Sequence, residues 1–93
     1  MKKYELAVVL KPSFEEEARK AELDKIFALI TRFGGTVDKV DEWGKRRLAY
    51  EIQKFSEGYY SFITFTADTD APMEIEQRMR IMENVLRYLI VTQ

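Results

Sequence analysis

The sequence predicts an α+β sandwich in which a four-stranded antiparallel sheet carries two helices on one face. Three observations predict it: four segments rich in β-branched and aromatic residues, two segments with a helical apolar period, and their order along the chain, βαββαβ. Ninety-three residues are enough for one modest hydrophobic core. Residues 1–93 are therefore expected to form a single domain.

The first strand and the first helix follow from the spacing of apolar residues. Residues 4–10 form a dense apolar run that is typical of a buried strand. Ser13 is a good N-cap, and Glu16 three residues later would complete a capping box. Apolar residues then recur with a 3.6-residue period, and the glycine pair 34–35 supplies a left-handed stop. We therefore expect a helix over residues 13–33.

The middle of the chain predicts a long hairpin. A strand begins at Thr36, is interrupted by a bulge or kink at Gly44, and continues to Ile52. Residues 54–58 are mostly polar and end in glycine, so we expect the turn there. Residues 59–67 are rich in aromatic and β-branched side chains and predict the third strand.

The last third of the chain predicts a second helix and a fourth strand. Pro72 suits a first helical turn, and Ile75, Met79 and Met82 would share one helix face. Residues 85–91 form the last strand. Right-handed crossovers then place both helices on one side of a sheet with strand order 4-1-3-2, the ferredoxin-like βαββαβ sandwich. Because this fold serves many unrelated functions, the side chains must indicate the function.

The composition narrows the function classes. The chain has neither cysteine nor histidine, which removes disulfides, thiol catalysis, the commonest general base and the commonest zinc ligand. No apolar stretch is long enough for a signal peptide or a membrane span, so we expect a cytoplasmic protein. We also expect no metal, no cofactor and no small-molecule substrate. The net charge of −1 does not by itself indicate a nucleic-acid-binding protein.

Positive charge is nevertheless concentrated in two places, the N-terminus and the predicted hairpin. If the bulge near Gly44 turned Arg46 and Arg47 to the same side, the two guanidinium groups would form a fork for phosphate oxygens. Charges on an edge strand also prevent sheets from associating, and the residues alone leave both interpretations open. The candidate RNA-binding residues are Lys2, Lys3, Lys45, Arg46, Arg47 and Lys54.

The sheet face without helices is expected to be unusually apolar. A contiguous apolar patch on a small protein usually marks a partner site, although a register shifted by one residue would exchange the two faces. Two aromatic residues near the hairpin could pack on the same partner or stack on a base. The candidate partner-protein interface comprises Ala7, Val9, Tyr60, Phe62, Leu89, Val91, Trp43 and Tyr50.

Other function classes find weaker support. Residues 60–65 half-match the aromatic signature of an RNA-recognition motif, but Tyr59 and Gly58 stand where its glycine and basic residue belong. An acylphosphatase-like enzyme would need a phosphate cradle after the first strand, where this chain has Pro12 and lacks both glycine and arginine. A ligand-binding regulatory module would use a glycine loop, but residues 34–35 are explained as a helix cap. The paired carboxylates at 41–42 are typical of solvated charges rather than a cation site.

The basic hairpin and the aromatic residues around it resemble the signature of a known family. The run Trp43-Gly44-Lys45-Arg46-Arg47-Leu48-Ala49-Tyr50, with Ile52, Lys54 and the following Gly58-Tyr59-Tyr60, resembles the signature of bacterial small-subunit ribosomal protein six. The opening Tyr4-Glu5 and the length are similar too. The chain departs from the family at Glu51, where many members carry proline, and it ends at Gln93, where many continue into a charged tail.

The resemblance implies a structural, non-catalytic protein of the ribosome. Members of this family bind the central domain of 16S ribosomal RNA on the platform of the small subunit, together with small-subunit ribosomal protein eighteen as a heterodimer. The basic hairpin would then meet RNA, and the open sheet face would meet protein. So few phosphate contacts predict modest RNA affinity for the chain alone.

Overall fold

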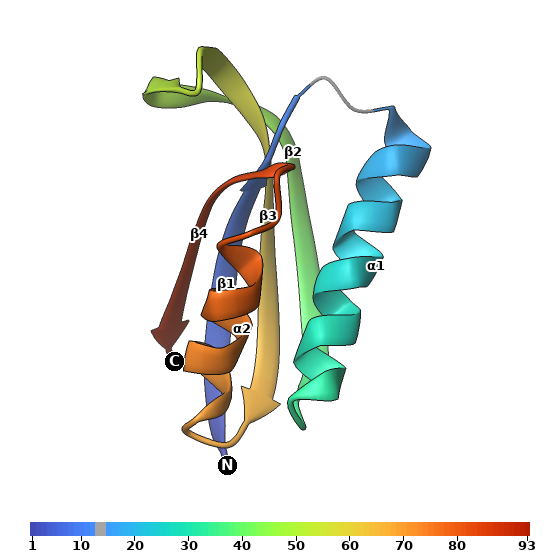
Figure 1. Ribbon diagram of the computed structural model, residues 1–93, viewed down its shortest axis with the longest axis vertical. Coiled ribbons are helices and arrows are strands. Elements are labelled where there is room, and N and C mark those ends of the chain that lie inside the picture. Colours follow the sequence, from blue (N-terminus) through green and yellow to red (C-terminus); the bar gives the residue numbers. More distant parts are fainter. Residues whose placement is uncertain (13–14) are drawn as a thin grey trace.

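The computed structural model describes residues 1–12 and 15–93, and over these residues the elements follow the predicted order (Figure 1). They are β1 (Lys2–Leu10), α1 (Glu16–Arg32), β2 (Thr36–Ile52), β3 (Phe55–Ala67), α2 (Ala71–Met79) and β4 (Val85–Thr92). Neighbouring strands are antiparallel, and their order across the sheet is β2-β3-β1-β4. This is the predicted order 4-1-3-2 counted from the opposite edge, so the ferredoxin-like fold class is confirmed.

The hydrophobic core lies between the sheet and the two helices. Apolar side chains of one parity along the strands meet those on the inner faces of α1 and α2. The largest fully buried side chains are Phe65, Leu6, Leu10, Ile26, Ile30, Ile63, Ile75, Met79 and Val8. Each contributes roughly 1.5–3 kcal/mol of transfer free energy, which is offset by chain entropy. The ring of Tyr4 stacks on Phe65 with 5.5 Å between centroids and closes the core near the N-terminus.

The predicted assignment of residues to the two sheet faces is confirmed. Leu6 pairs with Ile63 on the covered face, whereas Ala7 pairs with Phe62 on the other. On β4, Tyr88 and Ile90 pack against the core, so the alternating residues Leu89 and Val91 lie on the open face, as predicted. The register is therefore the predicted one.

The first helix begins later than predicted. Its first residue is Glu16 and its N-cap is Glu15, which makes no side-chain capping hydrogen bond. In a capping box the Glu is the third helical residue, and its side chain reaches back to the N-cap amide. Glu16 is the first helical residue, so its predicted capping-box role is wrong. Ser13 lies outside the described residues. The C-terminus is as predicted: Gly34 adopts φ +82°, and the Gly35 amide donates to the Ile30 carbonyl at 2.8 Å.

The hairpin turn lies earlier than predicted. Gln53 and Lys54 both have positive φ, 49° and 70°, which defines a two-residue type I′ turn, and β3 already begins at Phe55. Gly58 is therefore a strand residue. Its glycine is required by close packing, since a Cβ there would lie 2.4 Å from Cγ1 of Val9.

The second helix ends before the predicted apolar stripe is complete. Pro72 lies in its first turn, as predicted, and Ile75 and Met79 are buried on its inner face. Met82 follows the helix in the loop leading to β4 and is only partly buried against the core. Its side chain is thus left beside a groove between the two helices.

Candidate nucleic-acid interface

The tip of the β2–β3 hairpin projects beyond the rest of the sheet. Leu10, the last residue of β1, pairs with Tyr59, so the part of β3 before Tyr59 has no β1 neighbour. Figure 1 shows the tip bending over toward β4, the strand at the opposite edge of the sheet from β2. The bend coincides with two irregularities in the β2–β3 register, one between Glu42 and Gly44 and one between Arg47 and Ile52.

A small second apolar cluster anchors this tip. Leu48 is buried, and its Cδ2 lies 3.7 Å from the position a Cβ would occupy on Gly58. Beneath Gly58 lies Val9, which is only 5% exposed although it belongs to the open face. Neither Leu48 nor Val9 is part of the main core. The hairpin tip is therefore attached to the open side of the sheet by its own packing.

A polar contact extends this attachment to β4. Arg87, which pairs with Val9 across the sheet, donates a hydrogen bond from Nη1 to the Tyr50 hydroxyl at 3.2 Å. The Arg87 guanidinium also lies 6.0 Å from the centre of the Tyr50 ring. Sequence reasoning missed Arg87, because only the curl of the hairpin brings Tyr50 to the far edge of the sheet.

The basic residues of the hairpin are exposed on this tip. Residues 45–47 pair in unbroken register with residues 59–57 of β3, so Arg46 and Arg47 point to opposite faces. The predicted arginine fork is therefore wrong, because the bulge lies at Trp43, before the cluster. Among the residues that the structure describes, the ion pairs are Lys20–Glu16 and Lys25–Glu22, and neither involves the hairpin. The cationic side chains of Lys45, Arg46, Arg47 and Lys54 are thus available to an anionic partner.

The N-terminal lysines form a separate basic region. Lys2 and Lys3 pair with Ala67 and Thr66, at the end of the sheet opposite the hairpin tip (Figure 1). Lys3 lies on the open face, where it helps line a groove of about 550 Å³ together with Lys39, Trp43 and the carboxylates of Glu5, Asp38 and Asp41. The six candidate RNA-binding residues therefore form two positive regions rather than one continuous patch.

An aromatic pair marks the middle of the open face. The Trp43 ring packs on Phe62 at 4.7 Å between centroids, and its Nε1 donates to an Asp41 carboxylate oxygen at 3.2 Å. The Arg46 guanidinium lies 6.0 Å from the Trp43 ring. This aromatic surface thus adjoins the basic tip. The structure places the candidate RNA-binding residue Arg46 beside the candidate interface residues Trp43 and Phe62.

The other predicted interface residues differ in how accessible they are. Leu89 and Val91 on β4 are 53% and 42% exposed, and Tyr50 on the hairpin is 60% exposed. Ala7, Tyr60 and Phe62 are half-buried between them, whereas Val9 is covered by the Leu48 cluster. The most exposed apolar side chains on this face are therefore those of Leu89, Val91, Tyr50 and Trp43, which is 51% exposed.

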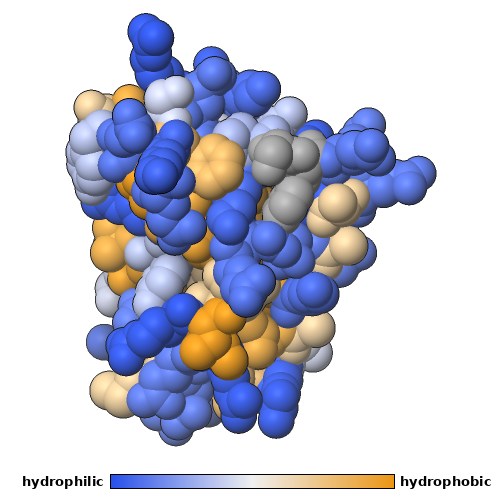
Figure 2. Space-filling model, turned by 45° about the horizontal axis from the view of Figure 1, so that its top comes forward, coloured by the Kyte–Doolittle hydropathy of each residue, from blue (hydrophilic) through white to orange (hydrophobic). Residues whose placement is uncertain are grey.

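Two other properties bear on the kind of site. Within the described ranges, no three carboxylate side chains come close enough together to hold a metal ion. No helix in these ranges is long and apolar enough to cross a membrane. On the face drawn in Figure 2, hydrophilic residues dominate and the apolar residues form separate patches.

Comparison with known proteins identifies the family. Residues 3–92 match the model of the family described as Ribosomal protein S6. The small ribosomal subunit protein bS6 of Clostridium botulinum is 50% identical over 93 residues, covering 100% of this chain and 99% of that protein. The corresponding protein of Clostridium beijerinckii is 48% identical, covering 100% and 98%.

The solved structures agree with the sequence matches. The crystal structure of 30S ribosomal protein S6 from Thermotoga maritima superimposes with a TM-score of 0.93 at 31% identity, covering 99% of this chain and 87% of that one. Relatives of this kind are structural proteins of the small subunit of the cytoplasmic ribosome. The resemblance noted in the sequence is thereby confirmed, and the chain belongs to the ribosomal protein S6 family.

Proposed function

We propose that the chain binds the central domain of 16S ribosomal RNA through its hairpin tip, as a heterodimer with small-subunit ribosomal protein eighteen. The observation that carries this proposal is the tip itself, in which four cationic side chains, none of them ion-paired among the described residues, adjoin the exposed Trp43 packed on Phe62. Such a surface suits phosphate contacts beside partly unstacked bases at an RNA junction.

The charge distribution supports a local rather than a general RNA contact. The protein as a whole carries a net charge of −1, so long-range attraction to RNA is weak. The hairpin tip, with its four cationic side chains, and the N-terminal lysines are the positive regions that we propose for contact with phosphates. A few phosphate contacts give modest affinity that falls steeply with salt. Tight binding therefore requires a second anchoring surface, which a protein partner supplies.

The open sheet face is the surface proposed for that partner. Leu89 and Val91 present apolar side chains along β4, and Trp43 and Phe62 present aromatic ones across the sheet. Apolar and aromatic side chains of this kind form the centres of protein interfaces, whereas RNA backbone contacts favour charge. Because the tip adjoins this face, one bound partner would lie beside the RNA.

Catalysis forms no part of the proposed role. The chain contains no histidine and no cysteine, so the commonest general base and the thiol nucleophile are absent from the sequence. The chemistry that the site offers is electrostatic and apolar contact.

Filter binding to a transcript of the RNA central domain tests the RNA side. We expect tight binding only when purified ribosomal protein eighteen is present. The double substitution R46A/R47A should weaken binding at least tenfold, and it should lower the salt-dependence slope by about one for each phosphate that the variant no longer neutralises. The matched control, K20A/R80A, removes the same charge from the helix side and should bind normally. Nanomolar binding by the chain alone would contradict the proposal.

Analytical ultracentrifugation with ribosomal protein eighteen tests the protein side without RNA. Leu89→Glu places a charge in the proposed interface and should abolish the heterodimer, because a buried unpaired charge costs several kcal/mol. Met73→Glu is the matched control, since Met73 is exposed on α2. A heterodimer that survives Leu89→Glu but not Met73→Glu would place the partner on the helix side instead.

A further inference from the structure

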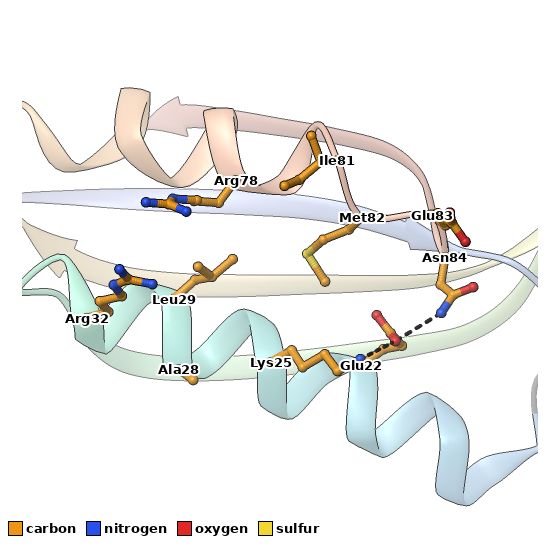
Figure 3. A pocket seen from close by; sticks show the side chains of 10 residues that line it. All are labelled: Glu22, Lys25, Ala28, Leu29, Arg32, Arg78, Ile81, Met82, Glu83 and Asn84. Atoms are coloured by element: carbon orange, nitrogen blue, oxygen red, sulfur yellow. Dashed lines mark hydrogen bonds and ion pairs between the residues drawn. The ribbon is translucent and has the colours of Figure 1, made fainter.

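A groove of about 570 Å³ lies on the helix side of the molecule, away from the open sheet face (Figure 3). Its two walls are the second half of α1 and the last turn of α2 with the loop that follows. The family signature and the hairpin tip contribute none of its lining residues. The groove is therefore a feature that the proposed RNA and protein contacts leave unexplained.

One end of the groove is fixed by a buried carboxylate. Glu22 is only 6% exposed and accepts hydrogen bonds from Nδ2 of Asn84 at 2.9 Å and from Nζ of Lys25 at 3.2 Å. The Asn84 carbonyl in turn accepts from the backbone amide of Lys11 at 3.1 Å. These bonds join α1, the loop before β4 and the end of β1. The groove is thus pre-formed, and a ligand would not need to order it.

The floor of the groove is apolar. Leu29 and Met82 are partly buried against the core and turn their outer surfaces into the space between the helices (Figure 3). Ile81 at the rim is 76% exposed and adds an apolar side chain beside the floor. A flexible methionine beside two branched aliphatic residues suits one or two inserted apolar side chains.

Two arginines lie at the other end of the groove. Arg32 belongs to the last turn of α1 and Arg78 to the last turn of α2, and both line the groove (Figure 3). Among the described residues neither forms an ion pair, whereas Lys25 is bound to Glu22. An arginine pair of this kind binds carboxylates through charge-assisted hydrogen bonds.

We propose that this groove is a docking site for a protein segment that carries an apolar side chain flanked by carboxylates. The apolar side chain fits over Leu29 and Met82, and the carboxylates fit Arg32 and Arg78. An RNA strand would offer phosphates to the arginines but nothing for the apolar floor and the exposed Ile81. Because the groove and the open face lie on opposite sides of the sheet, two protein partners can be bound at once.

The test uses the full chain and a short capped peptide that carries leucine beside glutamates. Backbone amide NMR spectra recorded during a titration should show saturable shifts confined to the groove, centred on residues 28–32 and 78–82. The substitution R32E/R78E should weaken binding by at least about tenfold, because it replaces attraction with repulsion. Ile81→Ser should weaken it several-fold through the apolar contact alone. Arg32, Arg78 and Ile81 are all exposed, so an unchanged thermal unfolding temperature should verify that the variants fold.

Three controls distinguish this site from the other surfaces. Lys20→Glu, on an exposed lysine of α1 outside the groove lining, should leave binding unchanged. A peptide with lysine in place of glutamate should not bind, and a single-stranded oligouridylate should not shift the groove amides. The proposal is overturned if the lysine peptide binds equally well, if the oligonucleotide occupies the groove, or if R32E/R78E binds the acidic peptide with unchanged affinity. None of these results depends on RNA binding by the hairpin.

Discussion

Gly58→Ala tests how the hairpin tip is held to the sheet. An ideal Cβ on Gly58 would lie 2.4 Å from Cγ1 of Val9 and 3.2 Å from the Leu10 carbonyl oxygen. The first distance is far below van der Waals contact, and Val9 is covered and has little room to move. Gly58 has no positive φ, so backbone strain plays no part. The effect of the substitution therefore isolates close packing between β3 and β1.

The expected magnitude follows from two opposing terms. Replacing glycine with alanine restricts the unfolded chain and would stabilise a roomy strand position by ~0.4–1 kcal/mol. Overpacking a tight site costs ~1–3 kcal/mol. We therefore expect a net loss of about 1–2 kcal/mol, which corresponds to a fall in Tm of roughly 4–16 °C for a domain of this size.

A double-mutant cycle with Val9→Ala separates the clash from other causes. Val9→Ala alone removes two methyl groups and should cost ~1.5–2.5 kcal/mol from lost transfer energy and a residual cavity. In the double variant the new methyl on residue 58 occupies part of that cavity. The combined cost should be smaller than the sum of the single costs by at least ~1 kcal/mol.

Equilibrium urea unfolding followed by far-ultraviolet circular dichroism measures all four corners of the cycle. Trp43 fluorescence gives a second, local readout at the bulge. Strict additivity of the two substitutions would refute the reasoning, because it would mean that the Cβ of residue 58 and Val9 do not share the same space. A stabilising Gly58→Ala would refute it directly.

Two further substitutions test the polar contacts. Glu22→Ala removes the acceptor for Asn84 and should lower the free energy of unfolding in urea by ~1–3 kcal/mol. Asp24→Ala, on the exposed side of the same helix, should change that free energy by less than ~0.5 kcal/mol. Equal effects of the two would argue against the structural role of Glu22. Tyr50→Phe removes the hydroxyl that accepts from Arg87, and it should change the free energy of unfolding by less than ~0.5 kcal/mol. Hydrogen exchange at amides 49–54 should become faster. Unchanged exchange there would show that the contact does not restrain the tip.

The sequence predicted the layers of the fold better than its local geometry. Apolar periodicity identified every strand and helix and assigned the sheet faces, because one register buries the whole apolar set and the neighbouring register exposes it. Gly58 misled the prediction of the turn, since a glycine required for close approach resembles a glycine required for a turn. The type I′ turn at Gln53 and Lys54 lacks the usual asparagine or glycine and left little signal.

The candidate site was predicted by residue type but not by arrangement. The basic tip and the aromatic face were both found, because charge and aromatic content are properties of the sequence. The orientation of Arg46 and Arg47 was wrong, since it depends on where the bulge falls, and that is one residue before the glycine. The contact between Tyr50 and Arg87 joins residues far apart in the chain and required the three-dimensional course of the hairpin.

The central place of β1 has a consequence for the order in which the protein is made. This strand is translated before the other three, yet one of its two edges pairs with β4, up to Thr92. During synthesis the β2–β3 hairpin and its pairing with β1 are able to form early, but the other edge of β1 stays open until residue 92 has left the exit tunnel. Residues 68–92 must all emerge before β4 can cover that edge, so the nascent chain exposes the edge throughout that interval. An apolar strand with one open edge is a template for aberrant pairing, so the protein depends on prompt completion of its last strand.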